Sequence, residues 1–148
     1  LGDAFRALLC YQLLGYFWNS HQRAQMKGYR DLIAWQKAYE LAMKVYETTK
    51  GWPNEEQFGL TSQIRRASVS VIGNIAEGYG RGSRKEYLHH LQYAKGSLAE
   101  VEAYVVLARG LGYLTEPSAE ELMDTLAEAT RVLRGLMRSI ERSANNDR

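Results

Sequence analysis

The 148-residue chain is 45% hydrophobic and 24% charged, which is the composition of a folded globular domain and excludes global disorder. Its 19 Lys and Arg against 17 Asp and Glu give a net charge of only +2, so total charge does not mark it as a polyanion-binding protein. A single cysteine excludes an internal disulfide framework and fits a reducing compartment, so we expect a cytoplasmic protein.

Residues 1–27 form a leader that does not match the pattern of the rest of the chain. Its apolar stretch, residues 8–18, is interrupted by Gln12 and Gly15 and is too short to span a bilayer. It also lacks the small-residue cleavage site of a signal peptide, so we expect no membrane partner. Two interpretations stay open: sequence translated upstream of a start at Met26, or an extra apolar helix that docks on the domain or on a partner.

The first predicted helix spans about residues 30–50. Its apolar residues advance by three or four positions, which predicts one core-facing stripe: Leu32, Trp35, Tyr39, Ala42, Tyr46. Gly51 and Pro53 end it, because glycine is favoured just past a helix and proline cannot continue one.

The second predicted helix is under way by residue 60 and breaks at Gly78, Gly80 and Gly82. Its core stripe is Leu60, Ile64, Ala67, Val71, Ile75, Tyr79.

The third predicted helix opens with a capping box, in which Ser83 caps the helix and Glu86 reaches back to the cap. Its core stripe is Tyr87, Leu91, Ala94, Leu98, Val101, Val105, Ala108. Gly110 and Gly112 close it.

The fourth predicted helix starts at Thr115 and ends in a polar, frayed tail, residues 143–148. Its core stripe is Leu122, Leu126, Ala129, Leu133, Leu136, Ile140. Four long helices with short connections predict an all-α domain over residues 28–148, an antiparallel up-down four-helix bundle.

Charge is distributed in bands along this domain. Residues 60–96 carry a net +4, residues 97–130 a net −6 and residues 131–148 a net +3. Such bands can give a nearly neutral protein a basic face and an acidic face, or they can simply be solvated helix surfaces.

Arg65 and Arg66 are the first candidate nucleic-acid-binding residues. Antiparallel pairing of the second and third helices places Arg65 within a turn of Glu100 and Glu102, so an interhelical ion pair of Arg65 or Arg66 is one interpretation. The other is a guanidinium that faces outward and binds phosphate. Because adjacent helix positions differ by about 100° in direction, we expect one arginine of each kind. The same pairing places Asn74 level with His89.

The glycine-rich loop, residues 78–85, is the second candidate. Arg81, Arg84 and Lys85 lead into a helix N-terminus, where free N–H groups and partial positive charge favour an anion. The loop lacks the nucleotide-binding fingerprints. A tight turn that needs positive φ would explain its glycines but not its cations.

No set of residues suited to catalysis is visible. Glu86 and His89 form one Glu-x-x-His pair, but a di-metal bundle needs two such pairs and further glutamates. The serines have no partner histidine and acid suggested by the sequence. We therefore expect no enzyme activity, no metal and no cofactor.

The order of several motifs resembles one protein family. These are the small four-helix proteins encoded in intervening sequences of 23S ribosomal RNA genes, with relatives that act as accessory variability proteins of diversity-generating retroelements. Many members carry proline where Ile72 stands here, and the leader has no counterpart. The segments that carry the resemblance are residues 32–38, 59–67, 74–78 followed by Arg81 and Ser83, 96–102 and 111–114. The signature residues among them are Trp35, Gln63, Arg65, Arg66, Asn74, Glu77, Gly78, Glu100 and Glu102.

The resemblance implies a homopentameric barrel of bundles with a basic surface and without catalytic residues. In retroelement members it implies contact with a reverse transcriptase and its template RNA. From residues and resemblance together, we expect a non-enzymatic oligomer that binds RNA through phosphate contacts. The alternative is a protein-interaction scaffold that partners a reverse transcriptase and touches RNA only incidentally.

Overall fold

The computed structural model describes the backbone of residues 28–146 and the side chains of residues 28–142, so the leader lies outside the described residues. The described part is all-helical and contains no strand, which confirms the predicted all-α class. Four long helices are present: α2 (Ile33–Thr48), α3 (Leu60–Gly80), α4 (Arg84–Gly110) and α5 (Glu116–Asn146). Short 3-10 turns flank α2 and precede α3: η2 (Tyr29–Asp31), η3 (Thr49–Gly51) and η4 (Asn54–Glu56).

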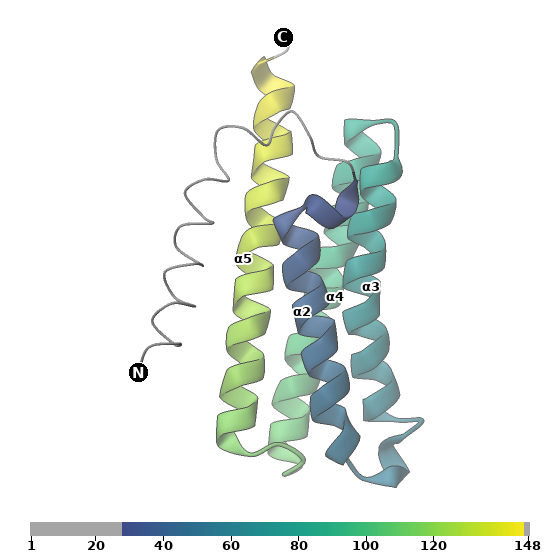
Figure 1. The fold of residues 1–148 in the computed structure, drawn as a ribbon, viewed down its shortest axis with the longest axis vertical. Coiled ribbons are helices and arrows are strands. Elements are labelled where there is room, and N and C mark those ends of the chain that lie inside the picture. The colour runs from purple at the N-terminus through teal and green to yellow at the C-terminus, as the bar shows by residue number, and fades with distance from the viewer. Residues whose placement is uncertain (1–27, 147–148) are drawn as a thin grey trace, which may run out of the picture.

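The four helices lie side by side around one core (Figure 1). α2 contacts both α3 and α5, and α4 also contacts both α3 and α5, so α2 and α4 occupy opposite corners of the bundle. The start of α2, the α3–α4 turn and the C-terminal part of α5 lie toward the upper end in Figure 1. None of the described helices is long and apolar enough to cross a bilayer.

The buried stripes of α3, α4 and α5 follow the predicted spacing. Every predicted core residue of these helices is buried, except four that are partly buried at the ends of the stripes: Tyr79, Tyr87, Leu136 and Ile140. Met137 of α5 is buried as well and was not predicted. The backbone of α5 remains helical to Asn146, so the prediction that the helix gives way to a frayed tail at residue 143 was wrong.

The predicted core stripe of α2 was partly wrong, although Leu32 and Ala42 are buried and Trp35 packs against the core. Two of its tyrosines are exposed, Tyr39 at 45% and Tyr46 at 43%. Besides the predicted Ala42, the helix buries residues that lie one position before the predicted ones: Ala34, Ala38, Leu41 and Val45. Small and aliphatic side chains can be enclosed completely, whereas a tyrosine needs water or a partner for its hydroxyl. The tyrosines therefore turn outward, and Tyr39 stacks on Trp35 with ring centroids 5.4 Å apart.

Side chains close both ends of the bundle. The Ser83 hydroxyl accepts a hydrogen bond from the Glu86 backbone N–H at 3.1 Å, as the capping box predicts. The Glu86 carboxylate, however, accepts from the Ser83 hydroxyl at 3.0 Å instead of from the cap backbone. At the other end Glu56 caps α3, because its carboxylate accepts from the Leu60 N–H at 2.8 Å. The same carboxylate accepts from the Tyr113 hydroxyl at 3.0 Å and so joins two connections.

Gly78 lies where α3 approaches α4 closely. A Cβ at this position would lie 2.8 Å from the His90 Cβ and 2.9 Å from a ring carbon of Tyr87. By contrast, a Cβ at Gly73, also in α3, would meet nothing within 4 Å. Gly78 is therefore required by packing, whereas Gly73 only weakens the helix.

We expect Gly78→Ala to destabilise the fold by about 1–3 kcal/mol, because α4 must shift to admit the methyl group. Gly73→Ala is the matched control in the same helix and should stabilise by about 0.5–1 kcal/mol. Chemical unfolding at one fixed protein concentration measures both. Equal effects of the two substitutions would contradict the close approach.

Tyr87 generates a second expectation. Its hydroxyl is buried without a hydrogen-bond partner among the described residues, and burial, with a smaller contribution from Tyr79, raises its pKa from 10.0 to about 12. Because the folded-state pKa is raised, the associated stability is present below pH 10 and is lost as pH rises from 10 to about 12. Tyr87→Phe should therefore unfold with a weaker pH dependence in that window, as followed by denaturant titrations at pH 9 and 11.5. Parallel pH profiles of the two proteins would contradict it.

Candidate nucleic-acid interface

Arg65 contacts the end of α2. Its Nε donates to the Thr49 hydroxyl at 2.8 Å, and its guanidinium lies 4.8 Å from the centre of the Tyr46 ring. The predicted ion pair with Glu100 or Glu102 is not formed, because Arg65 lies on the α2 side of α3, away from α4. Arg65 therefore fastens α3 to α2.

Arg66 lies about 100° around the helix from Arg65 and is exposed. It has no ion pair or hydrogen bond to another described residue, so its guanidinium is available to a ligand.

Polar side chains of α3 face α4 in a short network. The Ser97 hydroxyl donates to the Ser70 hydroxyl at 2.9 Å, and Ser97 is buried. Asn74 donates to the Ser70 carbonyl oxygen at 2.9 Å, and its own amide oxygen lies 3.3 Å from His90 Nδ1. The α4 partner of Asn74 is thus His90, one position beyond the predicted His89, which instead packs on the Tyr93 ring at 4.5 Å. This network fixes the register of α3 against α4.

Glu77 forms an ion pair with Arg81, one of the predicted binding residues. The two form a hydrogen-bonded ion pair one helical turn apart, and His90 Nε2 lies 3.8 Å from the same carboxylate. The hydrogen bond from Arg81, followed by the charge of His90, lowers the pKa of Glu77 below its usual 4.5. A phosphate must compete with Glu77 for Arg81, which weakens the case for Arg81 as a binding residue.

Arg84 and Lys85 occupy the first two positions of α4 and are both exposed. They follow the Ser83 cap directly, so two cations stand beside a helix N-terminus. The expectation that positive φ explains the loop glycines was wrong. Among the described residues only Gly112 has a φ in the left-handed region, at 77°, and it belongs to the α4–α5 turn.

The other signature residues have separate places. Trp35 packs between Tyr29 and Tyr39, whereas Gln63 and Glu100 are exposed. Glu102 lines an open groove between α4 and α5. No three metal-binding side chains cluster within the part of the chain that the structure describes.

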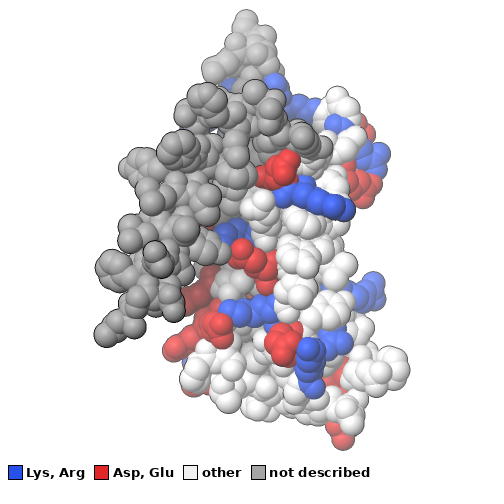
Figure 2. Space-filling model, in the orientation of Figure 1, with Lys and Arg blue, Asp and Glu red and all other residues white. Residues whose placement is uncertain are grey.

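The predicted binding residues do not form one site. Arg65 and Arg81 are sixteen positions apart along α3, which corresponds to about 24 Å. On the face shown in Figure 2, basic and acidic side chains alternate and form no continuous basic patch.

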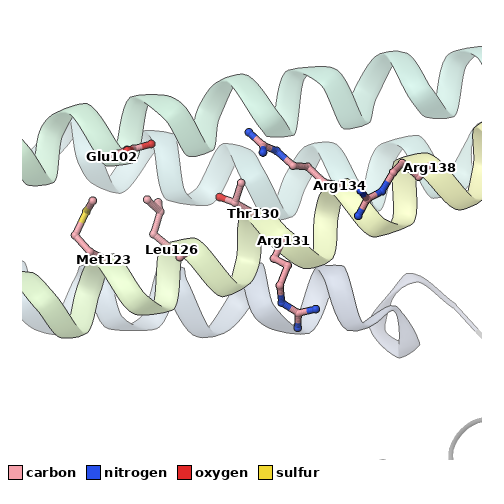
Figure 3. A pocket seen from close by; sticks show the side chains of 8 residues that line it. Glu102, Met123, Leu126, Thr130, Arg131, Arg134 and Arg138 are labelled. Atoms are coloured by element: carbon pink, nitrogen blue, oxygen red, sulfur yellow. The ribbon is translucent and has the colours of Figure 1, made fainter.

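The arginines of α5 were missed as candidate residues. Arg131, Arg134 and Arg138 line the groove that also contains Glu102 (Figure 3). Their signal in the sequence was the +3 charge of residues 131–148 together with helical spacing. Periodicity alone did not show which side of α5 they occupy.

The chain is similar to known proteins over most of its length. Residues 30–135 match the family described as 23S rRNA-intervening sequence protein. A crystal structure of a protein of unknown function from the S23 ribosomal protein family of Bacteroides thetaiotaomicron matches with a TM-score of 0.67 and 24% sequence identity. That match covers 72% of this chain and 96% of the other. No protein of curated function matches the sequence.

The two adjacent arginines of α3 should separate on substitution. Arg65→Ala removes a hydrogen bond and a cation–π contact and should destabilise by about 1–2 kcal/mol. Arg66→Ala changes the same charge on an exposed site and should stay within about 0.5 kcal/mol of the original protein. Thermal and urea unfolding of both variants measure the difference. A larger loss for Arg66→Ala would reverse the assignment.

Proposed function

Because the chain belongs to the 23S rRNA-intervening sequence protein family, we propose that it is a non-enzymatic, cytoplasmic protein that self-associates and binds RNA. In this proposal the four helices run in antiparallel up-down order, and the bundles assemble as a homopentameric barrel. The resemblance to retroelement accessory proteins supports the pentamer and adds a reverse transcriptase as a candidate partner.

The observation that carries the RNA-binding proposal is the pair of exposed cations at the start of α4, Arg84 and Lys85. The exposed ion pair between Arg109 and Glu116 indicates the register of α4 against α5 beside the turn that joins them. In that register Arg84 lies level with about Arg142, another exposed cation. Two helices thus contribute positive charge to the same end of the bundle, and such charge binds phosphates without reading base sequence.

Exposed apolar side chains support self-association. On α2, Tyr39, Met43 and Tyr46 follow helical spacing and are 43–56% exposed. On α4, Val106 and Leu107 are 59% and 50% exposed. A ring of identical subunits needs two different patches on each subunit, which meet head to tail. Because α2 and α4 occupy different corners of the bundle, the two patches lie on different sides of the subunit, which supports a head-to-tail contact.

Assembly would also explain how a chain with a low net charge can bind RNA. One chain carries only +2, and its cations are interspersed with carboxylates. A ring repeats the Arg84 and Lys85 pair once per subunit, so that several weak phosphate contacts act on one RNA molecule.

The second candidate function is a scaffold for a protein partner such as a reverse transcriptase. The same apolar patches on α2 and α4 favour it, because exposed apolar surface is typical of protein interfaces. In this alternative the charged residues steer docking of the partner, and RNA contact is incidental.

The double variant Arg84→Ala, Lys85→Ala separates the two candidates. It should weaken binding of a structured RNA by about tenfold or more and make the salt dependence shallower, because phosphate contacts are lost. Fluorescence anisotropy at two salt concentrations measures this, with the subunit number determined in parallel by mass measurement. Arg109→Ala is the control, because Arg109 lies at the other end of α4 and is held by Glu116. Unchanged RNA binding by the double variant would favour the scaffold.

A further inference from the structure

The groove between α4 and α5 is polar at one end and apolar at the other. It has a volume of about 390 Å³, which lies in the range of ligand-binding clefts. Along α5, Met123, Leu126 and Ala127 line its apolar part, and Thr130 lies in the middle. The remaining lining residues are the three arginines already described and Glu102 of α4.

The three arginines are not equivalent. Arg131 forms a two-point ion pair with Glu128, at 2.9 and 2.8 Å, and each partner shifts the pKa of the other toward the charged form. In Figure 3 Arg131 and Arg134 extend from opposite sides of α5. Arg134 and Arg138 form no ion pair or hydrogen bond with any described residue. Arg134 and Arg138 are therefore the cations that the groove offers to a ligand.

On α4, Glu102 lines the groove and Lys95 does not, although both lie on one stripe of the helix. Arg109 and Glu102 both face α5, since Arg109 pairs with Glu116 and Glu102 lines the groove. Lys95 lies seven residues before Glu102 on the same stripe of α4, because two helical turns return a side chain to nearly the same direction. In the α4–α5 register Lys95 lies level with about Arg131. The groove thus runs from two cations with no described partner, Arg134 and Arg138, to an apolar floor and a carboxylate.

We propose that this groove receives a single-stranded segment of the bound RNA, an inference that rests on the RNA binding proposed above. Arg134 and Arg138 are one helical turn apart, a separation of about 6 Å along the axis, which is close to the distance between neighbouring phosphates of an extended strand. The base of a nucleotide whose phosphate is bound by these arginines lies over Met123 and Leu126. The Glu102 carboxylate accepts a hydrogen bond from an exocyclic amine of that base. A nucleotide combines the anion and the flat apolar group that the two ends of the groove require.

The groove and the start of α4 have different roles in RNA binding. Arg84 and Lys85 contact backbone phosphates of any RNA at the end of the bundle. The groove discriminates, because a base can reach an apolar floor only when it is not paired. The protein should therefore prefer a structured RNA that carries a single-stranded overhang over the same RNA with a blunt end.

The test compares two hairpin RNAs that differ only in an overhang of about four nucleotides. The unsubstituted 148-residue chain should bind the overhang RNA about tenfold more tightly. Arg134→Gln with Arg138→Gln should abolish this preference and make the salt slope for the overhang RNA shallower by about 1.4, as expected for two lost single-strand contacts. Binding of the blunt hairpin should not change, and Arg109→Gln should behave as the native protein does.

Four results would overturn the inference. The first is equal binding of the two RNAs by the native protein, and the second is a preference for the overhang RNA that persists in the Arg134→Gln, Arg138→Gln variant. The third is an equal loss of affinity for both RNAs in that variant. The fourth is that polyglutamate competes for binding as effectively as the overhang RNA does. If the Arg84→Ala, Lys85→Ala variant loses binding of both hairpin RNAs, the proposed function still holds even when the groove inference is refuted. Failure of the native protein to bind either RNA would refute the proposed function itself. Circular dichroism of each variant verifies that these exposed substitutions leave the helices intact.

Discussion

The close contact of α3 with α4 is the constraint on which the rest of the structure depends. It requires the absence of a side chain at Gly78, where a Cβ would lie 2.8 Å from His90. A hydrogen bond between Ser70 and Ser97 and the Asn74–His90 contact then set the register of the two helices. Apolar stripes alone specify this register poorly, because neighbouring alignments bury similar areas. Polar groups that must find partners exclude those alternatives.

This register also determines which surfaces of α4 remain for other tasks. One side of α4 is occupied by α3, and its opposite flank, with Glu102 and Arg109, is presented to α5. Val106 and Leu107 lie on the outer surface of α4 and are exposed to solvent. A single helix therefore contributes to the core, to the groove and to an exposed apolar patch, and a change of register would move all three together.

The sequence predicted the helices and three of the four buried stripes because those stripes have no competitor. In α5, no large apolar side chain among the described residues is exposed, so only one face can be buried. In α2 two adjacent stripes are both apolar, one rich in alanine and one aromatic, and periodicity cannot choose between them. The choice depends on the space that α3 and α5 leave, which is a property of the assembled bundle. Alanine fits that space, and tyrosine does not.

The candidate site was predicted less well than the fold. Exposure of Arg84 and Lys85 follows from the capping box, which is local and can be read from four residues. The partners of Arg65 and Arg81 are decided by which neighbouring helix each side chain faces, and a one-residue error in register changes that answer. The groove is harder still to predict from the sequence, because its prediction requires the relative position of two helices and the direction of the Arg134 side chain. Local chemistry was thus predictable, whereas long-range juxtaposition was not.

The two ends of the bundle differ in how they would accept a longer chain. At the end that holds Glu56, one carboxylate caps α3 and also accepts from Tyr113, so the α2–α3 and α4–α5 connections depend on each other. Extra residues between η4 and α3 would pull this carboxylate away from both partners. At the opposite end, Gly82 has no neighbouring atom within 4 Å of where its Cβ would lie. The chain can be lengthened at the α3–α4 turn without disturbing a helix cap, provided that Ser83 still precedes α4.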